Sequence, residues 1–213
     1  MVEDRRVTVD GSAATIGMSI SKDQEVCVDG KRIGSAPKMI LIAVNKPKGI
    51  VCTTKDTEKN NIVNFINYKE RIYPIGRLDK DSEGLILMTN DGNIVNRMMR
   101  SRYAHEKEYV VTVHRTITKA FIEKMRSGVP ILGTVTKECS VERIGNKKFK
   151  IILTQGMNRQ IRRMCEYLGY EVISLKRVRI LNIELGDMKE GEYRNVTKEE
   201  MNVLFGIIRH SSE

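Results

Sequence analysis

The spacing of apolar and polar residues along the 213-residue chain predicts strands and helices in irregular succession. Residues 39–44 and 85–88 are nearly unbroken apolar runs, which favours strands buried on both faces. Residues 108–113 and 149–153 alternate between apolar and polar side chains, as half-buried strands do. Residues 171–180 contain a further strand with embedded basic side chains. These stretches predict the strands of a central sheet.

Helices are predicted where apolar residues recur at helical spacing, in most cases behind a capping residue. The expected helices begin near Ile62, after the capping residues Asp91, Thr118 and Thr197, and at residue 157. Thr197 and Glu200 have the spacing of a capping box, which satisfies two free N–H groups at a helix start. Strands and helices do not alternate regularly enough for a doubly wound parallel sheet. We therefore expect an α+β domain with a mixed, mostly antiparallel sheet and flanking helices.

The N-terminal residues have a pattern of their own. Residues 6–11 and 25–30 each alternate in polarity and end in Asp-Gly, a signal for a tight turn. A stretch of small residues with one proline, residues 34–38, follows as a linker. We therefore expect a small domain over residues 1–34 and a larger one over residues 39–213.

Composition narrows the classes of partner. The formal net charge is +10 and the isoelectric point is near 9.5, which favours a polyanion. No apolar run reaches transmembrane length and the N-terminus lacks the shape of a signal peptide, so we expect a cytoplasmic protein without a membrane partner. The cysteines Cys27, Cys52, Cys139 and Cys165 are scattered, as are the histidines, so we expect neither a metal nor a cofactor.

Four short motifs occur in order between residues 39 and 180. They are Asn45-Lys46-Pro47 with Gly49, then Gly76-Arg77-Leu78-Asp79 with Ser82 and Gly84, then Lys107-Glu108-Tyr109, then Gly156 with Asn158-Arg159-Gln160-Ile161-Arg162-Arg163. Together they resemble the RsuA branch of RNA pseudouridine synthases, and most closely the members that act on 23S ribosomal RNA. The N-terminal strands are similar to the back half of an S4 RNA-binding domain. The helical pair of such a domain would lie before Met1, so we expect only a partial S4 domain here.

The resemblance implies that Asp79, Tyr109 and Arg162 are catalytic. Isomerising uridine breaks a C–N glycosidic bond and makes a C–C bond. A carboxylate can attack the sugar carbon, add to the base or stabilise the positive charge on the sugar. These routes, and one through ribose proton abstraction, stay open. Arg162 would keep a buried Asp79 ionised through two parallel hydrogen bonds, and Tyr109 would stack on the flipped base.

The remaining candidates would contact RNA. They are Lys46, Arg77, Lys107, Asn158, Arg159, Gln160, Arg163, Lys176 and Arg177. By resemblance, the substrate would be a stem-loop of 23S rRNA. We expect the protein to be a monomer, and the absence of a ligand cluster indicates that it needs no metal. A non-catalytic rRNA-binding or ribosome assembly protein fits the basic charge equally well. Asp79, Tyr109 and Arg162 distinguish the two, because a protein that only binds RNA does not need them.

Overall fold

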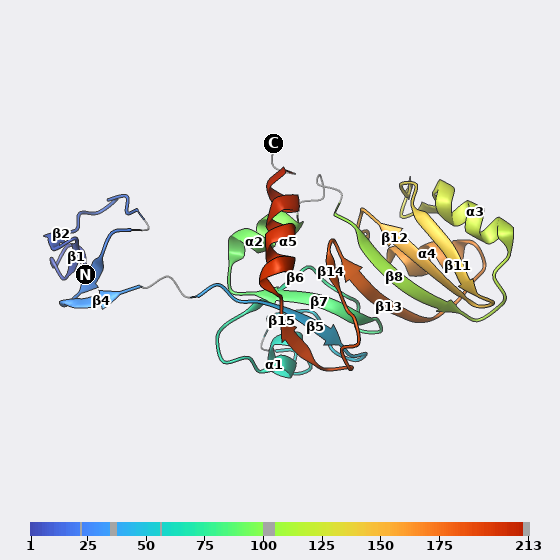
Figure 1. The fold of residues 1–213 in the computed structure, drawn as a ribbon, viewed down its shortest axis with the longest axis horizontal. Coiled ribbons are helices and arrows are strands. Elements are labelled where there is room, and N and C mark those ends of the chain that lie inside the picture. Colours follow the sequence, from blue (N-terminus) through green and yellow to red (C-terminus); the bar gives the residue numbers. More distant parts are fainter. Residues whose placement is uncertain (22, 35–37, 56, 100–104, 211–213) are drawn as a thin grey trace. The chain divides into compact units, whose positions relative to one another are not determined.

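The chain divides into two compact units, Met1–Lys38 and Met39–Glu213, in a computed structural model (Figure 1). The structure describes residues 1–21, 23–34, 38–55, 57–99 and 105–210, so the predicted linker lies largely outside the described residues. The predicted α+β class is confirmed, with a small antiparallel sheet in the first unit and a large mixed sheet with helices in the second.

The first unit is a four-stranded antiparallel sheet in the order β2-β1-β3-β4. Its strands are β1 (Val7–Val9), β2 (Ser12–Ala13), β3 (Val26–Val28) and β4 (Lys31–Ile33). Both predicted Asp-Gly turns are present, and all four turn residues have positive φ, from 49° at Asp10 to 79° at Gly11. Positive φ at both central residues gives a turn whose twist matches that of the strands. That this sheet belongs to an S4 domain stays a prediction.

The second unit is built on one mixed sheet, which has nine strands in the described residues. The main strand order is β11-β12-β8-β13-β7-β5-β15. In addition, β14 pairs with β13 and β6 pairs with β7. In chain order the elements are β5 (Leu41–Lys46), α1 (Ile62–Ile66), β6 (Tyr73–Ile75), β7 (Glu83–Thr89), α2 (Gly92–Met99), β8 (Lys107–Val113), α3 (Lys119–Ser127), β9 (Pro130–Ile131), β10 (Thr134–Val135), β11 (Ser140–Gly145), β12 (Lys148–Leu153), α4 (Gln160–Tyr167), β13 (Val172–Ile180), β14 (Ile183–Glu184), β15 (Tyr193–Asn195) and α5 (Lys198–His210). β9 and β10 form a separate two-stranded ribbon.

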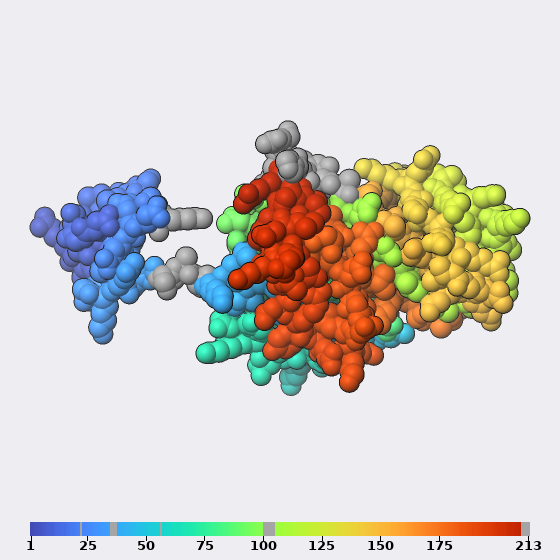
Figure 2. All heavy atoms as spheres, viewed as in Figure 1, coloured from blue at the N-terminus to red at the C-terminus, as the bar shows by residue number. Residues whose placement is uncertain are grey.

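Strands β5 and β7 are buried on both faces, which explains their unbroken apolar sequences. Leu85 and Leu87 share a core with α2 and α5, whereas Ile86 and Met88 share one with α1 on the other face. A third core lies between β8, β12, α3 and α4. Helix α5 lies at the surface of the unit (red in Figure 2), with Leu204 inside.

A parallel pair of strands joins the two halves of the sheet. Strand β13 pairs with β7 through Lys176 to Glu83 and Arg177 to Gly84, while its other neighbours, β8 and β14, run antiparallel. A β-bulge between Arg177 and Arg179 shifts the register against β8 at the same level. A Cβ at Gly84 would lie 2.3 Å from the carbonyl oxygen of Arg177, so only glycine permits this approach.

Several predicted boundaries differ from the observed ones. The strand predicted at residues 39–44 is Leu41–Lys46, and the helix predicted from residue 157 begins at Gln160. The later start has a local cause, because Arg159 has a left-handed backbone with φ of 49°. Met99, at the end of α2, is 53% exposed although it is apolar. No described helix has the length and apolar character that crossing a bilayer would require.

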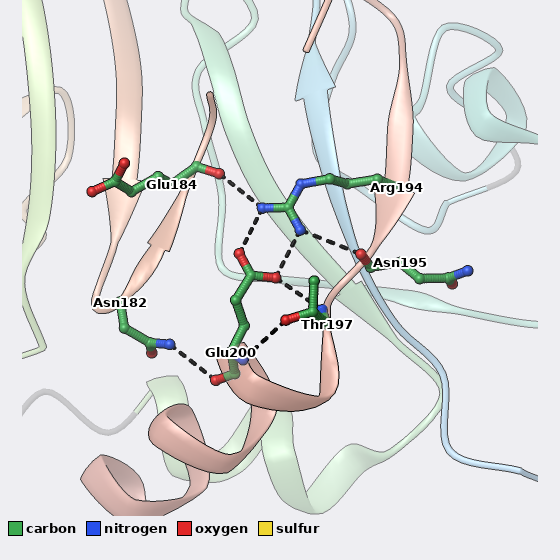
Figure 3. Close-up of polar contacts among 6 residues, drawn as sticks. All are labelled: Asn182, Glu184, Arg194, Asn195, Thr197 and Glu200. Carbon is green, nitrogen blue, oxygen red and sulfur yellow. Dashed lines mark hydrogen bonds and ion pairs between the residues drawn. The ribbon is translucent and has the colours of Figure 1, made fainter. Parts of the chain in front are cut away.

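Helix α5 begins with the predicted capping box, shown in Figure 3. The amide of Thr197 donates to Glu200 Oε2 at 2.9 Å, and the amide of Glu200 donates to Thr197 Oγ1 at 3.1 Å. Arg194 of β15 donates to both carboxylate oxygens of Glu200 at 2.7 Å and to the carbonyl of Glu184 in β14. One carboxylate therefore ties a helix start to two strands.

Glu200→Ala is expected to lower the free energy of unfolding by about 1–2 kcal/mol, because it removes a cap and a bidentate pair. The Arg194 guanidinium holds the pKa of Glu200 below its usual value, so this stabilisation is complete above the unfolded pKa. The stabilisation is lost as the pH falls through the pKa of Glu200 in the folded protein, which is the lower of the two values. Urea unfolding at neutral and acidic pH measures the difference. Glu199→Ala, an exposed neighbour in the same turn, is the control and should change little.

Candidate active site

The loop between β6 and β7 carries the charged residues that the sequence singled out. Backbone hydrogen bonds hold it, since Gly49 N donates to Lys80 O at 2.8 Å and Ser82 N donates to Asp79 O at 3.1 Å. Gly76 adopts φ of 79°, where a side chain would be strained. Leu78 anchors the loop in the core. The loop thus presents its side chains from a fixed backbone.

Three side chains from outside the loop fasten it at several points. Arg177 Nη1 donates to the carbonyl of Arg77 at 3.4 Å, and Arg162 Nη2 donates to the carbonyl of Asp81 at 3.0 Å. The Cys52 thiol accepts from Leu78 N at 3.3 Å. Two of these side chains come from the C-terminal half of the chain. The loop therefore takes its place only when both halves of the sheet are assembled.

A cavity of about 420 Å³ opens beside this loop. Its wall includes all three predicted catalytic residues, Asp79, Tyr109 and Arg162. His105, which sequence reasoning missed, is 4% exposed and also lines it. The sequence could have predicted it, because His105 continues the alternation of Tyr109 and Lys107 two residues before β8 begins. The volume lies in the range of small-molecule sites.

The environment of Asp79 differs from the expected one in two respects. Its side chain is 35% exposed, so the carboxylate is not buried. Its ion pair is with Arg159 at 3.9 Å, and Arg159 also reaches Asp81 at 3.8 Å. Arg162 does not pair with the carboxylate here but donates to the loop backbone. The sequence therefore placed the right cluster of arginines beside Asp79 but named a different member for the ion pair.

Tyr109 and Lys107 lie two residues apart in β8 and both line the cavity. Lys107 Nζ donates to the carbonyl of His105 at 3.1 Å. Burial, and then the neighbouring Arg177 charge, lower the pKa of Lys107 to about 8. Burial also lowers the pKa of His105. This wall of the cavity thus carries a lysine that loses its proton more easily than usual.

Three residues predicted to contact RNA are buried, and this corrects the prediction for Lys46. Gln160 and Arg177 also line the cavity, so RNA contact at these two positions stays a prediction. Lys46 is fully buried and donates to the carbonyls of Pro47 and Ile50 at 2.7 and 2.8 Å, so it shapes that loop. Burial lowers the pKa of its ammonium. Gln160 is 4% exposed and accepts from Met157 N at the start of α4. Arg177 is 2% exposed and lines the cavity from β13.

The other predicted RNA contacts are at least partly accessible. Arg77, Asn158, Arg159, Arg163 and Lys176 are exposed or half-buried, and the first three also line the cavity. Arg163 donates to the carbonyl and the side chain of Asn158. Their role in binding RNA stays a prediction. Among the described residues, no three His, Cys, Asp or Glu side chains gather as a metal site.

Comparisons with known proteins show the family of this chain. Residues 40–167 match the family described as RNA pseudouridylate synthase. The dual-specificity RNA pseudouridine synthase RluF of Escherichia coli K12 is 51% identical over 213 residues, covering 99% of this chain and 73% of that protein. Ribosomal large subunit pseudouridine synthase B of Bacillus subtilis is 30% identical, and the match covers 99% of this chain and 89% of that protein. A solved structure described as a pseudouridylate synthase has a TM-score of 0.73 at 26% identity. The match covers 94% of this chain and 89% of that one. The chain therefore belongs to the RNA pseudouridine synthases, isomerases of the branch that contains RsuA- and RluB-like enzymes.

Proposed function

We propose that this enzyme converts a uridine of large-subunit ribosomal RNA to pseudouridine in the cytoplasm, acting as a monomer on a 23S stem-loop. The observation that carries the proposal is that Asp79 and Tyr109 line the same cavity of about 420 Å³. The target class is supported by the similarity to a ribosomal large subunit synthase over nearly the whole chain. The net charge of +10 suits a ribosomal RNA substrate.

The uridine would enter the cavity flipped out of its stack, because a stacked base cannot bring its glycosidic bond to a side chain in a pocket. Asp79 has the exposure needed to meet a ligand, and it is held on a loop fastened at several points. Its carboxylate would act on the sugar or the base while the ring of Tyr109 supports the base. Arg77, Arg159 and Arg163 would hold the RNA backbone at the rim.

The test is chemical mapping of pseudouridine after incubation with separate 23S and 16S transcripts and with total RNA. We expect one modified uridine in the 23S transcript. Total RNA is included because the Escherichia coli relative is named a dual-specificity enzyme. Modification of the 16S transcript alone would overturn the proposed target while leaving the enzyme class intact.

Arg162→Lys is expected to lower turnover much more than RNA affinity. The guanidinium fork holds the carbonyl of Asp81 and lies 3.5 Å from Ser82 Oγ, and a lysine cannot reproduce both contacts. Asp79 would then lose its fixed position. Single-turnover rates and filter-binding constants measure the two effects. Arg163→Lys, on the same helix but bonded to Asn158, is the control. If affinity falls in step with the rate, Arg162 is a phosphate contact instead.

A further inference from the structure

The cavity wall that β8 and β13 form carries the cations Lys107 and Arg177. Arg177 is buried, and in the described part of the chain no Asp or Glu is buried. Buried charges are normally paired, because an uncompensated one is costly in a medium of low dielectric constant. A cationic wall of this kind suits a ligand that becomes negatively charged.

Lys107 is the more accessible of these two cations. It is half-buried and lies on the cavity face of β8, two residues before Tyr109. An ammonium group has three N–H donors. Within the described residues, Lys107 Nζ donates one hydrogen bond, to the carbonyl of His105. No carboxylate of the described residues lies within ion-pair distance of it. Lys107 therefore has donors to offer a group inside the cavity.

Arg177 lies on the neighbouring strand β13 and also lines the cavity. It pairs with Tyr109 across β13 and β8, and its Nε donates to the carbonyl of Leu85 at 2.6 Å. Its Nη2 is buried without a hydrogen-bond partner. The guanidinium is fixed by the sheet, so it supplies positive charge to the wall without touching solvent. Its charge also makes the proton of Lys107 easier to lose.

We propose that Lys107 is a catalytic residue that donates a hydrogen bond to a carbonyl oxygen of the flipped uracil and stabilises the negative charge on the departing base. Arg177 is a positioning residue that adds fixed positive charge to the same wall. This inference rests on the proposed reaction at Asp79 but not on which ribosomal RNA is the target. It replaces the role of RNA backbone contact that the sequence predicted for Lys107.

The step balances without a cofactor. The N1–C1′ bond breaks and its electron pair stays on the base, where N1 and the two carbonyl oxygens share the charge. Asp79 meets the electron deficiency at C1′. The base turns, C5 bonds to C1′, C5 loses its proton and N1 gains one, so substrate and product have the same composition. Lys107 keeps its proton throughout and acts only by hydrogen bonding and charge.

The experiment uses Lys107→Gln and Lys107→Arg in the full chain, with the RNA that the wild type modifies. Loss of one such donor costs about 10²–10³-fold in rate, so Lys107→Gln should lower the single-turnover rate at saturating RNA by that factor. RNA affinity should change little, and Lys107→Arg should recover much of the rate. Lys150→Gln on neighbouring β12, where the lysine pairs with Glu142, is the matched control. Thermal melting establishes that each variant is folded.

The pH profile separates catalysis from a structural role. The groups that share the cavity with Lys107 are His105 and Tyr109 near β8, Arg177 on β13, Arg77 and Asp79 on the loop, and Arg159 and Arg162 at α4. The wild-type kcat/KM should fall as pH rises through about 8, because Lys107 then loses its proton. Lys107→Arg should lack this fall, since arginine stays charged.

Three results would overturn the proposal. The first is a near-normal rate of Lys107→Gln at saturating RNA. The second is a loss of affinity large enough to account for the whole effect. The third is an unchanged fall above pH 8 in Lys107→Arg. Failure of the proposed reaction at Asp79 gives a different result from failure of the Lys107 proposal. In the first case Asp79→Asn would remain active, whatever the activity of the Lys107 variants.

Discussion

Replacing Asp79 by Asn is expected to reduce pseudouridine formation by roughly 10⁴-fold, the scale on which catalytic carboxylates act in other enzymes. The amide has nearly the same shape but neither the charge nor the nucleophilicity of the carboxylate. Asp79 is 35% exposed and its single ion pair in the described residues, with Arg159, is long at 3.9 Å. Removing its charge should therefore change stability and RNA affinity little. Single-turnover conversion of a mapped RNA measures the rate.

Asp81→Asn is the control for this experiment. Asp81 shares Arg159 with Asp79 at a similar distance, but its side chain is 69% exposed and does not line the cavity. The substitution keeps the backbone carbonyl that Arg162 holds. It should therefore lose far less activity than Asp79→Asn. Equal losses in the two variants would mean that the charge of the loop as a whole, and not one carboxylate, carries the chemistry.

Gly84→Ala is expected to destabilise the second unit by about 3 kcal/mol or more, through overpacking and backbone strain together. The new Cβ would lie 2.3 Å from the Arg177 carbonyl oxygen and 2.7 Å from its nitrogen, and the backbone has φ of 103°. Because both atoms belong to the backbone of β13, no side-chain rotation relieves the contact. The strands must separate, which moves Arg177 away from the loop. Urea unfolding measures the loss of stability.

Gly92→Ala gives the matched control. Gly92 is the first residue of α2 and has no neighbour within 4 Å of its missing Cβ. Alanine has the higher helix propensity, by up to about 1 kcal/mol, so this variant should be as stable as the wild type or slightly more so. If Gly84→Ala is equally well tolerated, the parallel pair of strands is not as close in solution as the structure describes.

The sequence correctly predicted the turns and helix caps, because these depend on interactions between residues close together in the chain. The turns at Asp10 and Asp29, the cap at Thr118 and the box at Thr197 follow from neighbouring residues, and the structure has each of them. Short strands such as β6, β14 and β15 were not predicted. Each has two or three residues, and it is the neighbouring strand that fixes its conformation, so no sequence period marks it.

The candidate site was predictable as a set of residues but not as an arrangement. Four motifs identified Asp79, Tyr109 and Arg162, and all three line one cavity. Burial reversed the expectation for Lys46, because a basic residue in an apolar strand has the same sequence pattern whether it faces solvent or the core. Arg159, the ion-pair partner of Asp79, has a left-handed backbone that the residue types around it do not predict.

The parallel contact between β7 and β13 also governs when the enzyme becomes competent. Glu83 pairs with Lys176, so this contact closes a loop of about 90 residues, a long span whose ordering is slow relative to the nearby β11–β12 hairpin. Asp79 leaves the ribosome well before the strand that anchors its loop. A nascent chain that ends before β13 has the carboxylate but lacks the β13 part of the cavity wall and the Arg177 bond to the loop, and so should be inert toward the RNA around it. Catalytic activity is thus among the last properties that the folding chain acquires.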